Sequence, residues 1–526
     1  MRSLITTLIA CGPLLSPVQG ATLDLVIRHG RVVDGTGSPA WFADVGVKDG
    51  RIEQLGIIDD GGKMEIDATG LTVAPGFIDV HTHAENIVEL PLAENFVRMG
   101  VTTLVLGNCG SSEQDVGRFF RRIEATNVSI NIATLIGHGV IREKAMGGSF
   151  MRPPTESELA SMKSMVDEAM RDGALGLSTG LIYLPGAYAN TGEIAELAKV
   201  AARHGGIYAS HMRNEGTEIF SALDELFAIA TEAHIRAHVS HIKLSGPKSW
   251  DQSDRVLAAI ESARSRGLDI TQDEYVYTAS STGISQLLPD WVRAGTPSDF
   301  AGRVTNPSEK EKIISEMKAR LTRDGRPDYS YAVIADYAKD RSLNGKNIAE
   351  AARIKRGTSS LDDQIEAIIE IQKNGGASGV FHGMNEADLQ TFLQHPNTMF
   401  ASDSGVRKFL EGVPHPRGYG NNARVLARYV RELKLLKLEE AIRRMTTLPA
   451  NVFQIPNRGE LRVGGRADIV VFDPRKIQDL ATFQDPHRYA TGFAAVIVNG
   501  VVVVKDDEHT GARPGMVIRH QSNAGR

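Results

Sequence analysis

The middle of the chain alternates short, mostly apolar segments with longer amphipathic ones. The short segments are four to six residues long, which is typical of strands buried in a parallel sheet. The predicted strands are Phe77–Val80, Thr102–Leu106, Asn131–Ile136, Ala174–Leu177, Gly206–Ala209, Arg236–Ser240, Asp269–Asp273 and Thr398–Ala401. The predicted helices are Glu113–Ala125, Glu156–Arg171, Glu193–Arg203, Thr217–Ala233, Asp251–Arg266 and Glu386–Leu393. This alternation predicts an α/β protein with a TIM-type (β/α)8 barrel over residues 73–454.

An open, doubly wound sheet is the alternative architecture for such a pattern. No predicted strand is followed by Gly-x-Gly-x-x-Gly, so the barrel is favoured. The two ends of the chain, residues 21–72 and 455–526, instead carry short strand patterns and hairpin turns such as Asp49-Gly50 and Asn499-Gly500. They predict one small β-sandwich domain built from both termini.

A long polar segment separates the seventh and eighth predicted strands. This segment runs from about residue 290 to about residue 379. It is rich in Lys and Arg, and its pattern is typical of helices. We interpret it as an inserted subdomain. Long insertions in a barrel usually lie over the active site.

The first twenty residues have the features of an export signal. Arg2 supplies the positive end, and the apolar run Leu4–Leu15 is too short to span a bilayer. Cleavage between Gly20 and Ala21 would release an exported protein, which in bacteria means the periplasm. The alternative is a lipoprotein, because Leu8-Ile-Ala-Cys11 resembles a lipidation box and would anchor the protein through Cys11.

Composition, charge and cysteine count limit the classes of protein to which the chain can belong. The chain has 526 residues, 42% of them hydrophobic and 23% charged, and its net charge is −5. These values are ordinary for a globular protein and give no indication of a nucleic-acid partner or of a membrane span. The two cysteines, Cys11 and Cys109, exclude a disulfide framework if the signal is removed or Cys11 is lipidated.

Metal-binding side chains follow several of the predicted strands at the point where each strand ends. These residues are His81, His83, Cys109, His211, His241 and Asp403. An isolated His-x-His pair is more often a surface feature than a metal site. Because the strand ends of a barrel meet at one face, however, we expect all six side chains to lie close together. Imidazole and thiolate ligands favour zinc.

The motifs around these residues resemble the amidohydrolase superfamily, and within it the N-acyl-D-amino-acid deacylase (D-aminoacylase) family. The matching segments are Gly76-Phe-Ile-Asp-Val-His-Thr-His83, Gly107-Asn-Cys-Gly110, Ser210-His-Met-Arg-Asn-Glu215, Ser240-His-Ile-Lys243, Asp273-Glu-Tyr-Val-Tyr-Thr-Ala-Ser280, Ser402-Asp-Ser-Gly405 and His415-Pro-Arg-Gly418. The Asn-Cys-Gly segment is the most diagnostic. Many other amidohydrolases have a carboxylated lysine or a glutamate where this family has cysteine.

The resemblance implies the role of each site residue. Zinc would be held tightly by Cys109, His211 and His241, with His81 and His83 forming a weaker second position. Asp403 would be the general acid and base. The α-carboxylate of the substrate would be bound by Lys243, by Arg417 and by either Tyr275 or Tyr277, which strand alternation places on the same face.

The implied reaction is zinc-dependent hydrolysis of the amide bond of an N-acyl-D-amino acid, which releases a carboxylate and a free D-amino acid. The largely apolar Leu287–Trp291 segment favours neutral D-side chains, although Arg293 follows it closely. Three alternatives remain open. They are hydrolysis of dipeptides with a D-residue at the C-terminus, another amidohydrolase reaction such as cyclic-amide hydrolysis or deamination, and a zinc-binding protein without catalytic activity.

Overall fold

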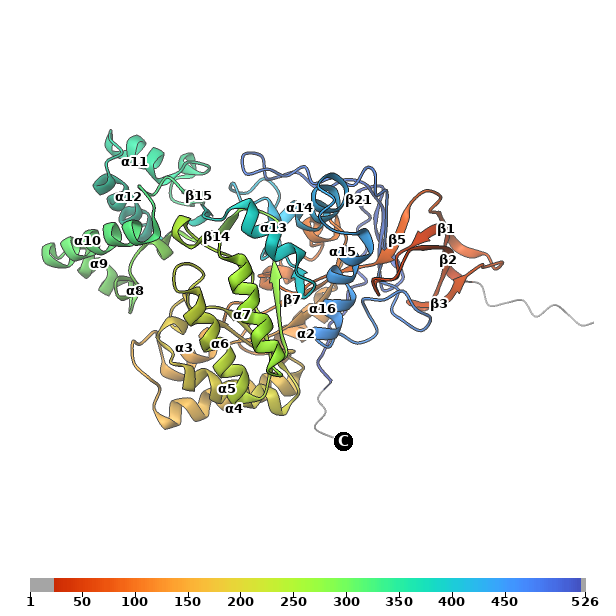
Figure 1. Ribbon diagram of the computed structural model, residues 1–526, viewed down its shortest axis with the longest axis horizontal. Helices are drawn as coiled ribbons and strands as arrows, with labels where there is room; N and C mark the ends of the chain where they lie inside the picture. Colours follow the sequence, from red (N-terminus) through yellow and green to blue (C-terminus); the bar gives the residue numbers. More distant parts are fainter. Residues whose placement is uncertain (1–22, 522–526) are drawn as a thin grey trace, which may run out of the picture.

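The computed structural model of the chain describes residues 23–521 (Figure 1). The predicted export signal and Cys11 lie outside the described residues, so export and lipid attachment stay predictions. Within the described part, no helix is both long and apolar enough to cross a membrane.

Parallel strands form a closed barrel at the centre of the molecule. Its strands are β6 (Phe77–Asp79), β7 (Val101–Leu106), β8 (Asn131–Thr134) continued by β9 (Ile136–Gly137), β10 (Gly176–Gly180), β11 (Ile207–His211), β12 (Arg236–Val239), β13 (Ile270–Glu274) and β17 (Thr398–Phe400). All neighbouring pairs are parallel, and a parallel bridge between Thr82 and Ser404 closes the ring between β6 and β17. The predicted TIM-type barrel is confirmed.

Amphipathic helices surround this barrel and bury their apolar faces against it. The main ones are α2 (Val116–Thr126), α4 (Glu156–Asp172), α5 (Thr191–Arg203), α6 (Ile219–Ala233), α7 (Ser253–Ser265), α13 (Glu386–Gln394) and α15 (Leu438–Met445). Thr155 and Glu158 form a capping box that fixes the start of α4. Helix α2 begins three residues later than predicted, because Asp115 accepts a hydrogen bond from the Arg118 N–H and caps it.

Strands from both ends of the chain form a nine-stranded sheet beside the barrel (Figure 1). These strands are β1 (Leu23–Val32), β2 (Trp41–Lys48), β3 (Arg51–Gly56), β4 (Gly62–Asp67), β5 (Thr72–Pro75), β18 (Ile469–Phe472), β19 (Phe493–Val498), β20 (Val501–Lys505) and β21 (Glu508–His509). The antiparallel pairing of β5 with β18 joins the N-terminal strands to the C-terminal ones. Asp468, just before β18, accepts a hydrogen bond from Asn131 of β8, and this bond connects the sheet to the barrel. Asp468 also forms an ion pair with Arg458.

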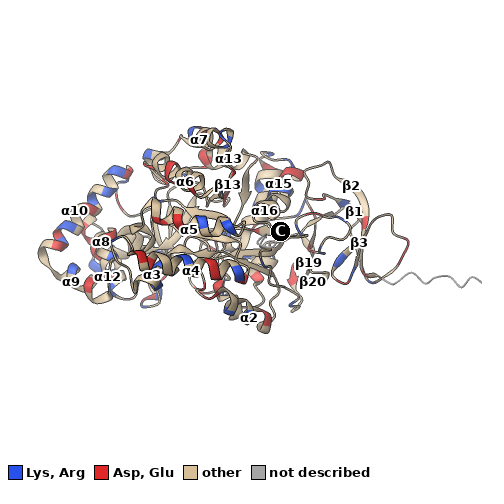
Figure 2. Ribbon diagram, turned by 90° about the horizontal axis from the view of Figure 1, so that it is seen from below, with Lys and Arg blue, Asp and Glu red and all other residues tan. Residues whose placement is uncertain are grey.

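Most of the segment between β13 and β17, from β14 to β16, extends away from the barrel as a separate body with its own hydrophobic core (Figure 1). It contains the antiparallel strands β14 (Ala279–Gly283), β15 (Ala332–Asp336) and β16 (Ser378–His382) and the helices α8 (Asp290–Arg293), α9 (Pro297–Thr305), α10 (Pro307–Asp324), α11 (Ile348–Arg356) and α12 (Leu361–Lys373). Figure 2 shows Lys and Arg interspersed with Asp and Glu along α10. Charges of both signs keep these helices soluble without creating a strong local field.

One buried arginine connects the outer layer to strand β17, which carries Asp403 at its end. Arg444 of α15 donates hydrogen bonds from Nε to the carbonyl of Thr398 and from Nη1 to the carbonyl of Leu393, both at 2.6 Å. Its guanidinium carbon lies 4.4 Å from the centre of the Phe400 ring. Since the side chain is completely buried, water cannot replace these contacts.

We therefore expect Arg444→Met to destabilise the protein by roughly 2–4 kcal/mol, because two buried carbonyls lose charge-assisted hydrogen bonds. The measurement is the free energy of unfolding in denaturant, compared with Arg118→Met on the exposed face of α2. Equal stability of the two variants would show that Arg444 does not anchor β17.

Candidate metal centre

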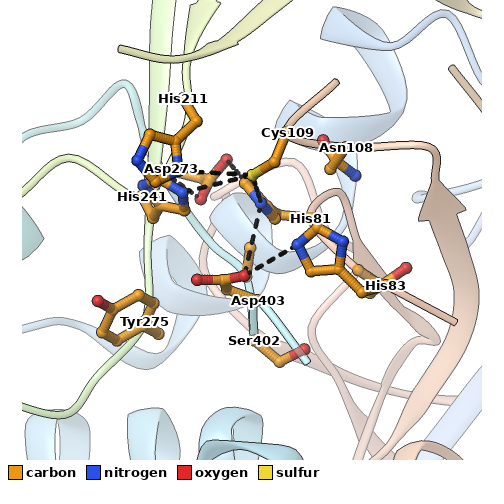
Figure 3. Close-up of polar contacts among 12 residues, drawn as sticks. His81, His83, Asn108, Cys109, His211, His241, Asp273, Tyr275, Ser402 and Asp403 are labelled. Atoms are coloured by element: carbon orange, nitrogen blue, oxygen red, sulfur yellow. Dashed lines mark hydrogen bonds and ion pairs between the residues drawn. The ribbon is translucent and has the colours of Figure 1, made fainter. Parts of the chain in front are cut away.

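The ends of five barrel strands bring six potential donor side chains together at one mouth of the barrel (Figure 3). His81 and His83 follow β6, and Cys109 follows β7. His211 is the last residue of β11, His241 follows β12 and Asp403 follows β17. This is the carboxyl-terminal face, where barrel enzymes hold their reactive groups.

The Cys109 sulfur lies at the centre of an imidazole cluster. Its Sγ atom is 3.2 Å from His81 Nε2, 3.6 Å from His241 Nε2 and 3.7 Å from His211 Nδ1. Burial alone would raise the pKa of the thiol, but the surrounding imidazoles lower it well below its usual value. Cys109 is thus a buried thiolate, which is a strong metal ligand.

Asp403 lies on the other side of the same cluster. Its Oδ1 atom is 3.2 Å from His83 Nε2 and 3.6 Å from His81 Nε2, and its Oδ2 atom is 2.9 Å from Arg417 Nη1. Burial would raise the pKa of this carboxyl, but Arg417 and His81 hold it well below the usual range. The carboxylate is therefore ionised at neutral pH and contacts both the imidazoles and a cation.

Three of the donor residues have left-handed backbone conformations. The φ angles are 53° at Cys109, 35° at His241 and 49° at Asp403. Such angles are uncommon outside glycine and cost roughly 1–3 kcal/mol each. The chain turns sharply where each strand ends, and this turn directs the side chain to the barrel axis.

Asp273, in β13, contacts the imidazole rings of His81 and His238 and the backbone of His241. Its Oδ1 atom accepts a hydrogen bond from the His241 backbone N–H, and its Oδ2 atom lies 3.3 Å from His81 Nδ1 and 2.7 Å from His238 Nε2. Burial would raise the pKa of Asp273, but His81 and His238 lower it below its usual range. The contact with Nδ1 leaves His81 Nε2 facing the sulfur, as metal-bound histidines require.

Glu215, in the loop after β11, orients the imidazoles of His241 and His211. Its Oε1 atom lies 2.8 Å from His241 Nδ1 and accepts a hydrogen bond of 2.7 Å from Lys243 Nζ, while Oε2 is 3.6 Å from His211 Nε2. Burial opposes ionisation here too, but Lys243 and the two histidines keep the pKa of Glu215 below its usual range. The other ring nitrogens of these two residues, His241 Nε2 and His211 Nδ1, face the Cys109 sulfur.

Tyr275 and Tyr277 lie in different surroundings. The Tyr275 ring lies near two cations, with its centre 5.6 Å from Lys243 Nζ and 4.4 Å from the guanidinium carbon of Arg417. The Tyr277 ring packs instead near His415, Phe483 and Arg424. Strand alternation does not extend to these residues because β13 ends at Glu274.

The residues that orient the imidazoles were not predicted from the sequence. Neither Asp273 nor Glu215 was assigned a role, and His238 was not among the candidate site residues. One sequence feature could have indicated Asp273: it ends a predicted strand, as the donor residues do. Glu215 and His238 carry no such feature, since their contacts depend on the folded barrel.

Two cavities border residues of this site. One, of about 880 Å³, lies between Glu215 and the Leu287–Asp290 segment and α10. The other, of about 560 Å³, is bounded by His83, Asp403 and Arg417. The Tyr183 hydroxyl accepts a hydrogen bond from Thr282, which lines the smaller cavity, and the Tyr183 ring centre is 5.0 Å from that of His211.

The chemistry of this donor set fits zinc. Three groups of side chains offer converging ligand atoms: His81, His83 and Cys109; Cys109, His211 and His241; and His81, His241 and Asp403. Imidazole nitrogen, thiolate sulfur and carboxylate oxygen are the ligands that zinc takes in proteins. Cys109 belongs to two of the three groups, so two neighbouring metal positions would share it.

Comparisons with known proteins agree with this chemistry. Residues 64–504 match the model of an amidohydrolase family. The chain is 35% identical to a D-aminoacylase of Alcaligenes xylosoxydans xylosoxydans, over 96% of this chain and 99% of that protein. It is 34% identical to an N-acyl-D-glutamate deacylase of the same organism, over 95% of this chain and 97% of that protein.

A solved structure is also similar to this chain in both sequence and fold. It is the N-acyl-D-glutamate deacylase of Bordetella bronchiseptica, complexed with zinc and a phosphonate inhibitor that mimics the tetrahedral intermediate of the reaction. It superposes with a TM-score of 0.81 at 34% identity, over 95% of this chain and all of that one. The chain belongs to the amidohydrolase family, and within it to the N-acyl-D-amino-acid deacylases.

Proposed function

We propose that the protein hydrolyses the amide bond of N-acyl-D-amino acids with zinc, releasing a carboxylate and a free D-amino acid. The observation that carries this proposal is the position of Asp403. Its carboxylate contacts the His81 and His83 imidazoles with one oxygen and Arg417 with the other. A proton acceptor thus lies between a metal-binding cluster and a cation that fits the substrate carboxylate.

In this proposal Cys109, His211 and His241 hold the tightly bound zinc, and His81 and His83 form the weaker position. Zinc bound there supplies a water of lowered pKa and polarises the amide carbonyl. Asp273 and Glu215 fix the orientation of the imidazoles, so that the donor atoms are arranged before the metal arrives.

Asp403 transfers the proton. As a carboxylate it accepts a proton from the attacking water, and it then donates that proton to the amide nitrogen. The C–N bond breaks, the water oxygen stays on the acyl carbon and the nitrogen leaves as an amine. An amide nitrogen is a poor leaving group until it is protonated, so the C–N bond breaks only after this transfer.

Lys243, Tyr275 and Arg417 bind the α-carboxylate. Both cations lie within 5.6 Å of the centre of the Tyr275 ring, and both are almost completely buried. A carboxylate between them would be desolvated and doubly paired. Cyclic amides and deaminase substrates lack such a carboxylate beside the scissile bond and would leave these three carboxylate-binding residues unused. A dipeptide with a D-residue at its C-terminus would use them.

The test is release of free amine from N-acetyl-D-methionine and from N-acetyl-L-methionine, with and without a zinc chelator. We expect the D-enantiomer to react faster by at least roughly tenfold, a difference of about 1.4 kcal/mol in activation free energy, and the chelator to abolish the reaction. Dipeptides with a C-terminal D-methionine form a second arm. Equal rates for both enantiomers, or no release from either, would contradict the proposal.

Asp403→Asn should fold, retain zinc and lose activity by roughly 10²–10⁴-fold, because the amide side chain cannot accept the proton of the water. Turnover of N-acetyl-D-methionine and zinc content are measured on the same sample. Substantial hydrolysis by this variant would exclude Asp403 as the proton carrier.

Cys109→Ala should purify with much less zinc than the wild-type protein, because the shared ligand of two donor groups is removed. Zinc content by elemental analysis is the measurement, and Asp403→Asn serves as the control that retains the cysteine. If both variants contained as much zinc as the wild type, the cysteine would be an ordinary buried thiol.

A further inference from the structure

The side chain of Asn421, in helix α14 (Arg417–Arg424), connects the ends of two neighbouring barrel strands. Its Oδ1 atom accepts a hydrogen bond of 3.1 Å from the Val276 N–H, and its Nδ2 atom donates one of 3.0 Å to the Ala401 carbonyl. Val276 lies shortly after β13, and Ala401 lies directly after β17. The side chain is completely buried, so water cannot replace either bond.

The Asn421 amide stands where the two strands would otherwise bond to each other. Strands β13 and β17 pair in parallel up to Glu274 and Phe400, and the Ala401 N–H then donates to the Glu274 carbonyl at 3.1 Å. With the regular spacing of a parallel ladder, the next bond would run from the Val276 N–H to the Ala401 carbonyl. Asn421 bonds to both of these groups instead. The amide therefore replaces one hydrogen bond of the ladder and separates the two strand ends.

The residues beside this amide belong to the proposed reaction. Tyr275 directly precedes one of the two bonded residues, and Asp403 follows the other by two positions. The Tyr275 ring lies near the cations of the carboxylate site, and Asp403 is the proton carrier. The separation of the strand ends thus bears on the spacing between the carboxylate site and the proton carrier.

Helix α14 contributes a second functional side chain from the same face. Arg417 precedes Asn421 by four residues, which places both on one side of the helix. The Arg417 Nη1 atom lies 2.9 Å from Asp403 Oδ2. Arg424 of the same helix donates from Nε to the Val276 carbonyl at 2.9 Å. Both backbone groups of Val276 are therefore bonded to α14.

Two glycines allow α14 to approach both strand ends closely. A Cβ atom on Gly418 would lie 2.6 Å from the Ser404 hydroxyl oxygen, and one on Gly420 would lie 2.6 Å from the Tyr277 hydroxyl oxygen. Ser404 belongs to the loop after β17, and Tyr277 belongs to the loop after β13. Such close packing leaves the helix little freedom to shift. The position of the Asn421 amide is therefore fixed relative to both loops.

We propose that Asn421 is a positioning residue for the hydrolysis, because the hydrogen bonds of its amide set the distance between Asp403 and Tyr275. The inference rests on the proposed function. The α-carboxylate and the amide nitrogen of the substrate are bonded to the same carbon atom, so the groups that bind them need a matching spacing. A misplacement of about 1 Å can lower a rate by roughly 10²-fold. Asn421 would thus act through the backbone of the two strand ends.

The test compares Asn421→Ala with Asn422→Ala. Asn422 is the next residue of α14 and is also completely buried, but its Nδ2 atom contacts Met445 Sδ, at 3.6 Å, and no strand end. The measurements on each variant are kcat and KM for N-acetyl-D-methionine, zinc content and the free energy of unfolding.

We expect Asn421→Ala to retain zinc, to lose kcat by roughly 10–10²-fold and to change KM by less than about threefold. The physical reason is that the α-carboxylate still binds while the scissile bond is misaligned with Asp403. Asn422→Ala should keep kcat within about twofold of the wild-type value.

Asn421→Asp is a second variant of nearly the same size. It keeps an acceptor for the Val276 N–H, but a carboxylate offers no N–H to the Ala401 carbonyl. We expect it to retain zinc and to lose kcat by a smaller factor than Asn421→Ala. This variant decides the question if Asn421→Ala does not fold: a kcat below the wild-type value supports the inference, and a wild-type kcat overturns it.

An unchanged kcat in Asn421→Ala, or a rise of KM alone, would overturn the inference and leave the proposed function intact. An equal loss of kcat in Asn422→Ala, or a loss explained by missing zinc or unfolded protein, would also overturn it, because the residue would then only stabilise the fold. Failure of the wild-type protein to hydrolyse N-acetyl-D-methionine would contradict the proposed function and the inference together.

Discussion

The contact between the Cys109 sulfur and three imidazole nitrogens determines how the rest of the site is built. A thiolate with three imidazole nitrogens within 3.7 Å of its sulfur, shielded from water, forms a stable group when a metal ion occupies the space between them. The need to bind a metal ion also explains the carboxylates that surround the imidazoles. Asp273 and Glu215 contact the outer nitrogens of His81 and His241, which leaves the inner nitrogens free to bind a metal.

The barrel supplies the geometry that this contact needs. Parallel strands that close into a ring bring their carboxyl ends to one face, although the residues involved are scattered from His81 to Asp403. The strained backbone at Cys109, His241 and Asp403 is tolerated because strand pairing and buried packing hold both flanks of each turn. Stability in the strands thus allows strain at their ends.

The sequence was sufficient to predict the barrel strands, the zinc chemistry and the family. Buried parallel strands have a strong local pattern, and the donor side chains directly follow them. Features that depend on three-dimensional closure were not predictable in this way. The contact of His238 with Asp273 joins two neighbouring strands. Tyr275 and Tyr277 separate because β13 ends at Glu274.

The pairing of β5 with β18 has a consequence for how the chain folds as it is synthesised. Strand β5 lies near the beginning of the chain and β18 near its end, so one edge of the N-terminal sheet has no partner until almost the whole polypeptide has left the ribosome. An open edge is a site of unwanted strand addition. The nine-stranded sheet therefore completes its folding last, even though its first strands are synthesised first. The barrel, which lies between β5 and β18 in the sequence, must fold while this sheet is still incomplete.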